Sequence, residues 1–237
     1  MTGYSAVALD VGGVIYYDEP FELAWLHGLH TLRSADDSSF TVGAFIEHAE
    51  RFYRHGDATL LGSPSQLEWS WNQVRRAWGE LAQPIPGALA AVAALAEHTP
   101  TVIVANQPPE CAAVLAAWGV TEACSAVFLD SLAGVSKPDP ALLELAVAHV
   151  GTAERLLVVG NRVDHDVRPA LALGCPVAFV LADPGYRPPA GVHPDIVAAH
   201  RRFRAPRTAP PAPSERVRIV ASLSELAESV VSTGTHL

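Results

Sequence analysis

The stretch ALDVGGVIYYDEP, residues 8–20, places a carboxylate and a glycine pair directly after an apolar run. The run SAVAL (5–9) has the length of a short buried strand and stops at Asp10, and Gly12 and Gly13 follow almost at once. Glycines allow unusual backbone angles and let backbone N–H groups approach an anion closely. A carboxylate at a strand end beside such a turn predicts a ligand site around Asp10.

Five more apolar runs share the length and the Val, Ile and Leu content of strands buried on both faces, at 101–105, 126–129, 155–160, 176–181 and 217–222. Helical patterns lie between several of them, at about 109–118, 140–150, 166–173 and 223–231. This alternation implies right-handed crossovers. The sequence therefore predicts an α/β fold built on a doubly wound parallel sheet.

Residues 17–84 interrupt the alternation with three aromatic, helix-like stretches, FELAWLHGLHTL (21–32), VGAFIEHAERFYRH (42–55) and SQLEWSWNQVRRAW (65–78). We interpret this region as a small helical domain inserted after the first strand. Pro84 and Pro86 mark the return to the sheet. The predicted division is an α/β core of residues 1–16 and 85–237 and a helical domain of residues 17–84.

Bulk composition excludes several classes of protein. Hydrophobic residues make up 49% of the 237 residues, enough for a sizeable core, and the formal charge of −9 disfavours binding to nucleic acid. No apolar run approaches the length of a membrane span, so we expect no membrane association. Three scattered cysteines, and an N-terminus without a basic region before a long apolar stretch, predict a cytoplasmic protein without a signal peptide.

Polar residues directly follow several of the predicted strands: Asp10, Asn106, Asp130, Asn161, Asp164 and Asp166. One helix-capping aspartate after a strand is ordinary, but a whole set at the carboxyl edge of one sheet predicts a functional site. A carboxylate there can act as a nucleophile, and Lys137 in the loop GVSKPDP could offset negative charge beside it. Further oxygen ligands could hold Mg²⁺.

Four of these stretches, in this order, resemble the four sequence motifs of the haloacid dehalogenase-like (HAD) hydrolases: DVGGVI (10–15), VIVANQP (102–108), GVSKPDP (134–140) and VGNRVDHDVRPALALG (159–174). The resemblance spans essentially the whole core. It implies a Rossmann-like HAD core, and the helical insertion resembles the cap domain that this family carries after its first motif.

The resemblance also implies roles for individual residues. Asp10 would be the nucleophile, and Lys137 would bridge Asp10 and the transferring group. The substrate anion would be bound by Gly12, Gly13, Asn106 and Lys137. Mg²⁺ would be held by Asp10, the carbonyl of Gly12, Asn161 and Asp166.

The sequence departs from the family pattern at three positions. Gly12 replaces an aspartate that acts as general acid and base, a loss of about 10²–10⁴ in rate. Ala105 stands where a hydroxyl residue usually contacts the phosphate, and Asn161 replaces an acid, which predicts weak or absent Mg²⁺ binding. Asp18 or Glu19 could stand in for the missing acid. Asp164 could support the metal site or cap the following helix.

We predict a HAD-like hydrolase, a phosphatase that acts on a small phosphorylated metabolite through an aspartyl-phosphate at Asp10. One alternative is other chemistry in the same pocket, such as carbon-centred displacement or a specialised biosynthetic step. Another is a catalytically silent binding or regulatory protein. The expected partner is a small anionic molecule.

Two regions outside the motifs keep two interpretations each. The segment 183–216 is rich in Pro and Arg, and its run HRRFRAPR (200–207) fits a solvated loop or a contact with an anion or partner. In the helical insertion, Arg51 and Arg54 fit a solvated helix face or a contact with an anionic leaving group. Four tryptophans there fit either core packing or a substrate platform, Trp25, Trp69, Trp71 and Trp78.

Overall fold

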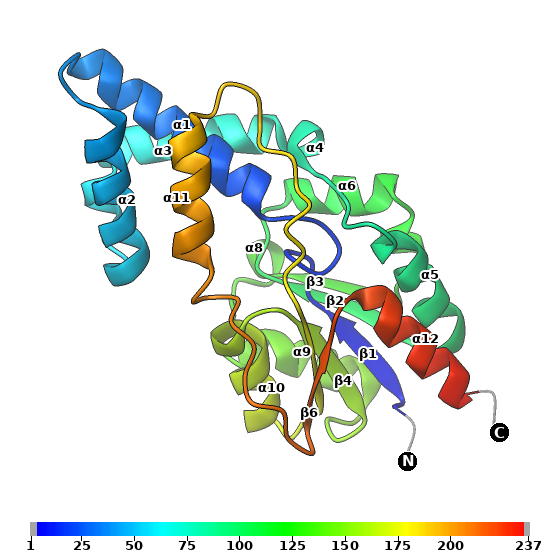
Figure 1. Ribbon diagram of the computed structural model, residues 1–237. Helices are drawn as coiled ribbons and strands as arrows, with labels where there is room; N and C mark the ends of the chain where they lie inside the picture. Colours follow the sequence, from blue (N-terminus) through cyan, green and yellow to red (C-terminus); the bar gives the residue numbers. More distant parts are fainter. Residues whose placement is uncertain (1–3, 235–237) are drawn as a thin grey trace. The chain divides into compact units, whose positions relative to one another are not determined.

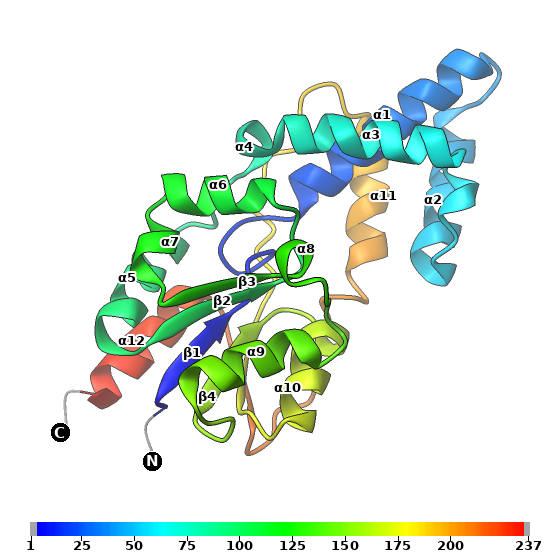
Figure 2. The ribbon, with the colours of Figure 1, turned by 180° about the vertical axis from the view of Figure 1, so that it is seen from behind.

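The computed structural model describes residues 4–234, which form two compact units (Figures 1 and 2). The core unit consists of the chain up to Tyr17, Gln83–Gly185 and the chain from Thr208 onward. The helical unit consists of Asp18–Ala82 and Tyr186–Arg207.

The core unit contains a six-stranded sheet in which every neighbouring pair is parallel, in the order β3-β2-β1-β4-β5-β6. All six predicted strands are present: β1 (Ala6–Leu9), β2 (Thr101–Ala105), β3 (Ala126–Leu129), β4 (Leu156–Gly160), β5 (Val177–Val180) and β6 (Val217–Val220). The chain starts in the middle, builds towards one edge through β2 and β3, and then crosses to β4 on the other side of β1. The carboxyl ends of β1 and β4 therefore form the topological switch point, where open α/β sheets bind ligands.

Helices cover both faces of this sheet, with α9 and α10 on one face and α5 and α12 on the other (Figures 1 and 2). The four predicted helical regions are confirmed, and α5, α7 and α8 are additional. The helices are α5 (Ala88–His98), α6 (Glu110–Ala117), α7 (Val120–Ala123), α8 (Asp130–Ala133), α9 (Ala141–Val150), α10 (Arg168–Ala172) and α12 (Leu223–Gly234). The predicted α/β class is thus confirmed.

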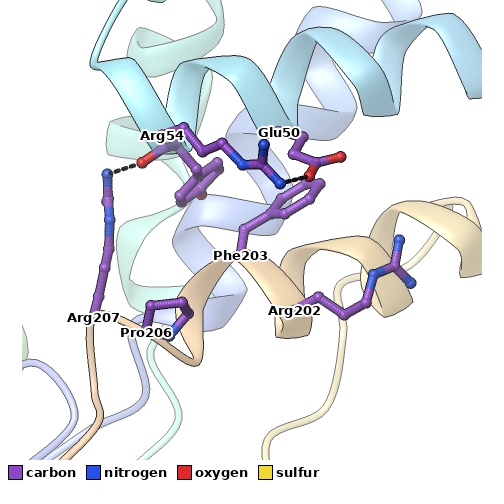
Figure 3. A pocket seen from close by; sticks show the side chains of 7 residues that line it. Glu50, Arg54, Arg202, Phe203, Pro206 and Arg207 are labelled. Carbon is purple, nitrogen blue, oxygen red and sulfur yellow. Dashed lines mark hydrogen bonds and ion pairs between the residues drawn. The ribbon is translucent and has the colours of Figure 1, made fainter.

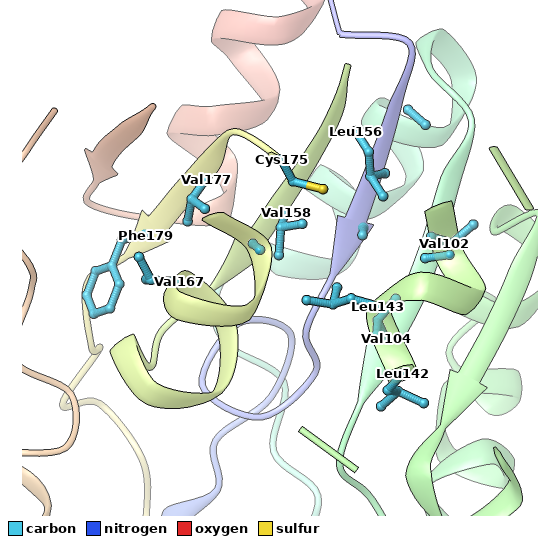
Figure 4. Close-up of a cluster of buried hydrophobic side chains, with 14 of the residues drawn as sticks. Val102, Val104, Leu142, Leu143, Leu156, Val158, Val167, Cys175, Val177 and Phe179 are labelled. Carbon is cyan, nitrogen blue, oxygen red and sulfur yellow. The ribbon is translucent and has the colours of Figure 1, made fainter. Parts of the chain in front are cut away.

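One face of the sheet packs on α9 and α10 through alternate residues of the strands (Figure 4). Ala6 and Ala8 of β1 belong to this cluster, as do Leu142 and Leu143 of α9 and Phe179 of β5. Complete burial of a side chain of the size of Leu or Phe contributes about 1.5–3 kcal/mol to stability. The strands that precede the polar residues are therefore held in place by a packed hydrophobic core.

The helical unit is built from five helices and a short 3-10 turn, α1 (Glu19–Asp36), α2 (Val42–His55), the turn Ala58–Leu60, α3 (Pro64–Arg76), α4 (Trp78–Leu81) and α11 (Pro194–Arg204). All three helix-like stretches of the insertion are helical. Ser63 and Gln66 form a capping box that begins α3, and Trp78 stacks on Phe21 with ring centroids 4.0 Å apart. Within residues 4–234, no helix combines the length and the apolar character that a membrane crossing requires.

The segment 183–216 differs from the predicted solvated loop, because its middle forms α11. This helix packs on α1 and α2, so residues 186–207 group with the helical unit, whereas the sequence division assigned them to the core. The buried face of α11 combines Ile196 and Ala199 with His200 and Arg204. A search for apolar periodicity overlooks such a helix, because half of its buried positions are polar.

Candidate active site

Asp10 directly follows β1, at the switch point of the sheet. Its backbone N–H donates to the carbonyl of Val159, 2.8 Å away, and so continues the pairing of β1 with β4. The chain then turns tightly, because the carbonyl of Val11 accepts from the N–H groups of Val14, Ile15 and Tyr16. Asp10 is thus held by backbone hydrogen bonds on both sides of its position.

Lys137, from the loop between α8 and α9, is the centre of the polar cluster. Its Nζ donates to Asp10 Oδ1 at 2.9 Å, to Asp166 Oδ1 at 2.6 Å and to the Val104 carbonyl at 3.1 Å. Burial alone would lower the pKa of Lys137, but the charges of Asp10 and Asp166 outweigh it and hold the pKa above its usual range. The structure therefore brings together three of the predicted residues around one ammonium group.

The members of this cluster differ in their access to solvent. The side chains of Lys137 and Asp166 are 3% and 2% exposed, whereas that of Asp10 is 12% exposed. Asp10 is thus the carboxylate of this cluster that a ligand reaches first.

Asp166 accepts hydrogen bonds on both carboxylate oxygens. Oδ1 accepts from Lys137, and Oδ2 accepts from the backbone N–H groups of Asn161 and Arg162, at 3.1 and 3.0 Å. A π-helical turn, Val163–Val167, carries Asp166 back to these groups, and a Cβ at Gly160 would lie 2.2 Å from Asp166 Cγ. In this arrangement Asp166 orients Lys137, and its expected role as a metal ligand stays a prediction.

Asn161 is buried against Gly13. Its Oδ1 has no hydrogen-bond partner among the described residues, and a buried unsatisfied acceptor costs about 1–3 kcal/mol. Gly13 has a φ of +71°, and a Cβ on it would lie 1.8 Å from Asn161 Nδ2. The glycine at position 13 is therefore required both by its backbone angle and by the space that Asn161 fills. Its N–H donates to the Tyr16 carbonyl at 2.7 Å and so serves the turn.

Asn106, at the end of β2, holds the loop of Lys137. Its Nδ2 donates to the Lys137 carbonyl at 2.6 Å, and its Oδ1 accepts from the Lys137 N–H at 2.9 Å. The amide thus fixes the backbone from which the ammonium group extends. Its predicted contact with a substrate anion stays a prediction.

Sequence reasoning missed Gln107, which connects the end of β2 to Asp130 and Tyr16 through hydrogen bonds. The Gln107 N–H donates to Asp130 Oδ1 at 2.7 Å, and its side-chain Oε1 accepts from the hydroxyl of the buried Tyr16 at 2.7 Å. Its position next to Asn106 in the sequence was a signal that could have identified Gln107 as part of the site. Tyr16 carried no such signal, because only folding brings it to β2.

The oxygen donors near Asp10 fit a weakly charged magnesium site. Within residues 4–234, no group of three or more His, Cys, Asp or Glu side chains is arranged to hold a metal ion. The unsatisfied Oδ1 of Asn161 is a hard oxygen donor of the kind that Mg²⁺ prefers, and Asp10 supplies one negative charge. By the chemistry of their oxygen donors, Asp10, Asn161 and the carbonyl of Gly12 suit the ion, and the full expected set with Asp166 stays a prediction.

The residues considered as substitutes for missing groups have other partners. Asp164 accepts two hydrogen bonds from Arg162, at 3.1 and 2.7 Å. Burial opposes ionisation of Asp164, but Arg162 lowers its pKa to about 2. Asp18 and Glu19 lie in the helical unit, where their carboxylates approach Arg204 to 3.5 Å.

Comparison with solved structures reveals the same fold at low sequence identity. YfnB from Bacillus subtilis, described with bound magnesium, is 17% identical with a TM-score of 0.66, covering 97% of this chain and 99% of that one. A HAD phosphatase from Thermococcus onnurineus is 15% identical (TM-score 0.65, 95% and 97% covered). The L-2-haloacid dehalogenase of Xanthobacter autotrophicus is 21% identical (TM-score 0.60, 96% and 98% covered). No curated protein matches the sequence.

A family model adds what these distant structures cannot. The model described as haloacid dehalogenase-like hydrolase matches residues 4–174, which include Asp10, Asn106, Lys137, Asn161 and Asp166. The match covers more than half of the chain and all four motifs. The chain therefore belongs to the haloacid dehalogenase-like hydrolases.

Proposed function

We propose that the protein hydrolyses small phosphate esters, with Asp10 as the nucleophile. The observation that carries this proposal is the hydrogen bond from Lys137 Nζ to Asp10 Oδ1, made by an ammonium group that Asp166 and the Val104 carbonyl hold in place. A fixed positive charge beside an accessible carboxylate suits attack on an anionic phosphoryl group.

The reaction would proceed in two displacements at phosphorus. An oxygen of Asp10 forms a bond to phosphorus while the bond to the leaving oxygen breaks, giving an aspartyl-phosphate and the leaving group as an oxyanion, which takes a proton from water after it departs. Water then attacks phosphorus, releases phosphate and restores the Asp10 carboxylate. Lys137 would stabilise the negative charge in both steps, and Asn106 would keep Lys137 in position. Mg²⁺, held by Asp10, Asn161 and the Gly12 carbonyl, would supply further charge neutralisation.

The residue at position 12 determines which esters suit this site. Gly12 supplies no acid to protonate the leaving oxygen, and Asp18 and Glu19 belong to the helical unit, where they lie beside Arg204. A leaving group that departs without a proton must be a weak base. We therefore propose substrates with acidic leaving groups, such as acyl, enol or activated aryl phosphates.

The test is phosphate release from a series of aryl phosphates that differ only in the acidity of the phenol, with Mg²⁺ and with EDTA. The rate of the wild type should fall steeply as the phenol becomes less acidic. Gly12→Asp should flatten this dependence and raise the rate on the poorest leaving groups by about 10²-fold, since a general acid contributes about that much or more.

Asp10→Asn provides the decisive variant, because an amide is a far weaker nucleophile than a carboxylate. Its rate should fall by about 10⁴-fold or more. Asp195→Asn, on the exposed first turn of α11, removes the same charge elsewhere and should leave the rate unchanged. Equal rates for the wild type and Asp10→Asn would refute the proposal.

Carbon-centred displacement is the second candidate, favoured by the same glycine. A halide leaves carbon without a proton, so Gly12 would be no handicap. The dehalogenase from Xanthobacter autotrophicus, with its covalently bound chloropropionic acid, shows this chemistry on a similar fold. Chloride release from 2-chloropropionate, insensitive to EDTA, together with inert aryl phosphates would favour this candidate. No turnover of either substrate would favour a binding protein.

A further inference from the structure

A pocket of about 400 Å³ lies within the helical unit, between α2 and the end of α11 (Figure 3). Such a volume accommodates a small organic ligand. Its lining combines charged and aromatic side chains, namely Glu50, Tyr53, Arg54, Arg202, Phe203, Pro206 and Arg207.

The pocket carries net positive charge in a chain whose formal charge is −9. Three of the lining residues are arginines, and one is an acid. Glu50 pairs with Arg54, one helical turn away, at 2.5 Å. The charge of Glu50 is therefore neutralised by Arg54. Arg202 and Arg207 add two further positive charges to the lining. Guanidinium groups bind phosphate and carboxylate through paired hydrogen bonds.

The aromatic part of the lining is a stacked pair of rings. Tyr53 and Phe203 lie with ring centroids 5.5 Å apart and planes inclined by 29°. Arg207 lies over the Tyr53 ring, 4.8 Å from its centroid, and donates to the Tyr53 carbonyl at 3.3 Å. Tyr53 thus contacts both Phe203 and Arg207, and both rings line the pocket. A flat ligand ring can extend this stack.

Buried hydrogen bonds hold this wall in place. The Tyr53 hydroxyl donates to Glu22 at 3.1 Å, and Glu22 also accepts from Arg204 at 2.7 Å. His200 Nε2 lies 2.6 Å from the same carboxylate. These contacts within the chain order the pocket wall and so reduce the free energy that ligand binding must spend on ordering.

The arginines of the run HRRFRAPR divide between structure and pocket. Arg201 stacks on Tyr186 and donates to its hydroxyl, and Arg204 binds the carboxylates of α1. Arg202 and Arg207 line the pocket. The catalytic proposal leaves this basic run unexplained. Arg201 and Arg204 hold the helical unit together, whereas Arg202 and Arg207 line the pocket.

We propose that this pocket binds an organic phosphate that carries a planar ring, the chemistry of a nucleotide. The arginines of the lining bind the phosphate groups, and the ring stacks on Phe203. The lining consists of residues of the helical unit and includes neither Asp10 nor Lys137, and its occupation does not depend on turnover.

The test is isothermal titration calorimetry of the full chain in EDTA and low salt, with ADP, pyrophosphate and adenosine as probes. ADP should bind more tightly than either of the other two, because it alone offers both anion and ring. Arg202→Glu should weaken ADP binding about tenfold or more, since a lost charge-assisted hydrogen bond has at least that effect. Arg76→Glu, on the exposed face of α3, is the control with the same charge change and should bind ADP as the wild type does.

Two further variants separate the parts of the proposal. Phe203→Leu should reduce the affinity for ADP to that for pyrophosphate, and Asp10→Asn should leave the affinity for ADP unchanged. The absence of ADP binding at millimolar concentration would overturn the proposal. Equal effects of Arg202→Glu and Arg76→Glu would overturn it as well, and so would loss of ADP binding in Asp10→Asn, which would place the ADP at the other site.

Discussion

Each of the two units buries one cation among carboxylates, and the two clusters differ in composition and in surroundings. In the core unit, Lys137 lies between Asp10 and Asp166. In the helical unit, Arg204 of α11 lies among Asp18, Glu19 and Glu22 at the start of α1. The same kinds of charge thus occur in both units at different ratios.

The core cluster joins three distant segments of chain and leaves one carboxylate accessible. Asp166 is fully engaged by Lys137 and two backbone N–H groups, so it is a fixed counter-charge. Asp10 is the more exposed carboxylate. This asymmetry between two acids on one ammonium group is consistent with the proposed role of Asp10 as the nucleophile.

The helical cluster contains more acid than its cations can match. Arg204 binds Glu22 closely, at 2.7 Å, but Asp18 and Glu19 only at 3.5 Å. Burial raises the pKa of Asp18 to about 6, against the opposing charge of Arg204. Burial also acts on Glu22, but Arg204 and His200 outweigh it and hold the pKa of Glu22 below its usual range. The comparison shows one strong pair with two weaker neighbours, an arrangement that fastens α11 to α1.

The largest expected effect comes from replacing the buried cation of each cluster, Lys137 or Arg204, and comparing stability and turnover. Lys137→Met and Arg204→Met should each lower the free energy of unfolding by about 3–5 kcal/mol, because buried carboxylates lose their counter-charge. Urea denaturation followed by circular dichroism measures this. Turnover per folded molecule should be lost in Lys137→Met and retained in Arg204→Met.

Arg76→Met, on an exposed helix face, is the control for this pair and should change stability by less than about 0.5 kcal/mol. Unchanged stability in Arg204→Met would show that the helical cluster does not fasten α11. Retained turnover in Lys137→Met would remove this lysine from the proposed mechanism.

A smaller effect tests whether the core cluster requires a glycine at position 13. Gly13 and Gly134 both have positive φ, +71° and +73°, but a Cβ on Gly134 meets nothing within 4 Å. Gly134→Ala should therefore lower the free energy of unfolding by about 1–2 kcal/mol through backbone strain alone. Gly13→Ala should lose about 1–3 kcal/mol more, because its methyl group displaces Asn161. Equal losses in the two variants, measured by urea denaturation, would mean that Asn161 moves aside without cost.

The smallest effect sharpens the description of the acid-rich cluster through pH. Because the pKa of Asp18 is raised from 3.8 to about 6, the folded protein binds a proton that the unfolded chain has released. The contribution of Asp18 to the free energy of unfolding therefore falls as the pH rises from about 4 to 6. Asp18→Asn should stabilise the protein by about 1 kcal/mol at pH 7 and not at pH 3.5, as a quarter of the side chain is exposed and screened.

Glu22→Gln is the matched contrast, since the pKa of Glu22 is shifted in the opposite direction. Its native pairing contributes stability above the ordinary pKa of Glu and loses it as pH falls, so the variant should be destabilised at pH 7. Denaturation curves at several pH values compare the two variants. Shifts of the same sign at pH 7 would contradict the division of roles between the two acids.

The sequence predicted the sheet and the place of the site because both depend on local patterns. Each strand is a short apolar run, and β1, β2 and β4 are directly followed by Asp10, Asn106 and Asn161. Parallel pairing brings the carboxyl ends of strands to one edge, so the polar residues after them converge. Lys137 could be added by resemblance, because its loop has a distinctive sequence.

Other features were set by contacts between segments far apart in the chain. The helix α11 escaped prediction because His200 and Arg204 become acceptable in a buried face only beside Glu22. The engagement of both Asp166 oxygens, the support of Gln107 by Tyr16 and the pocket of Arg202 and Arg207 depend on tertiary packing in the same way. Sequence alone determined which segments are strands and where their polar ends meet, because apolar periodicity and strand direction are local. Tertiary structure alone decided which charges are paired, because the burial of a charge depends on partners that only the folded chain supplies.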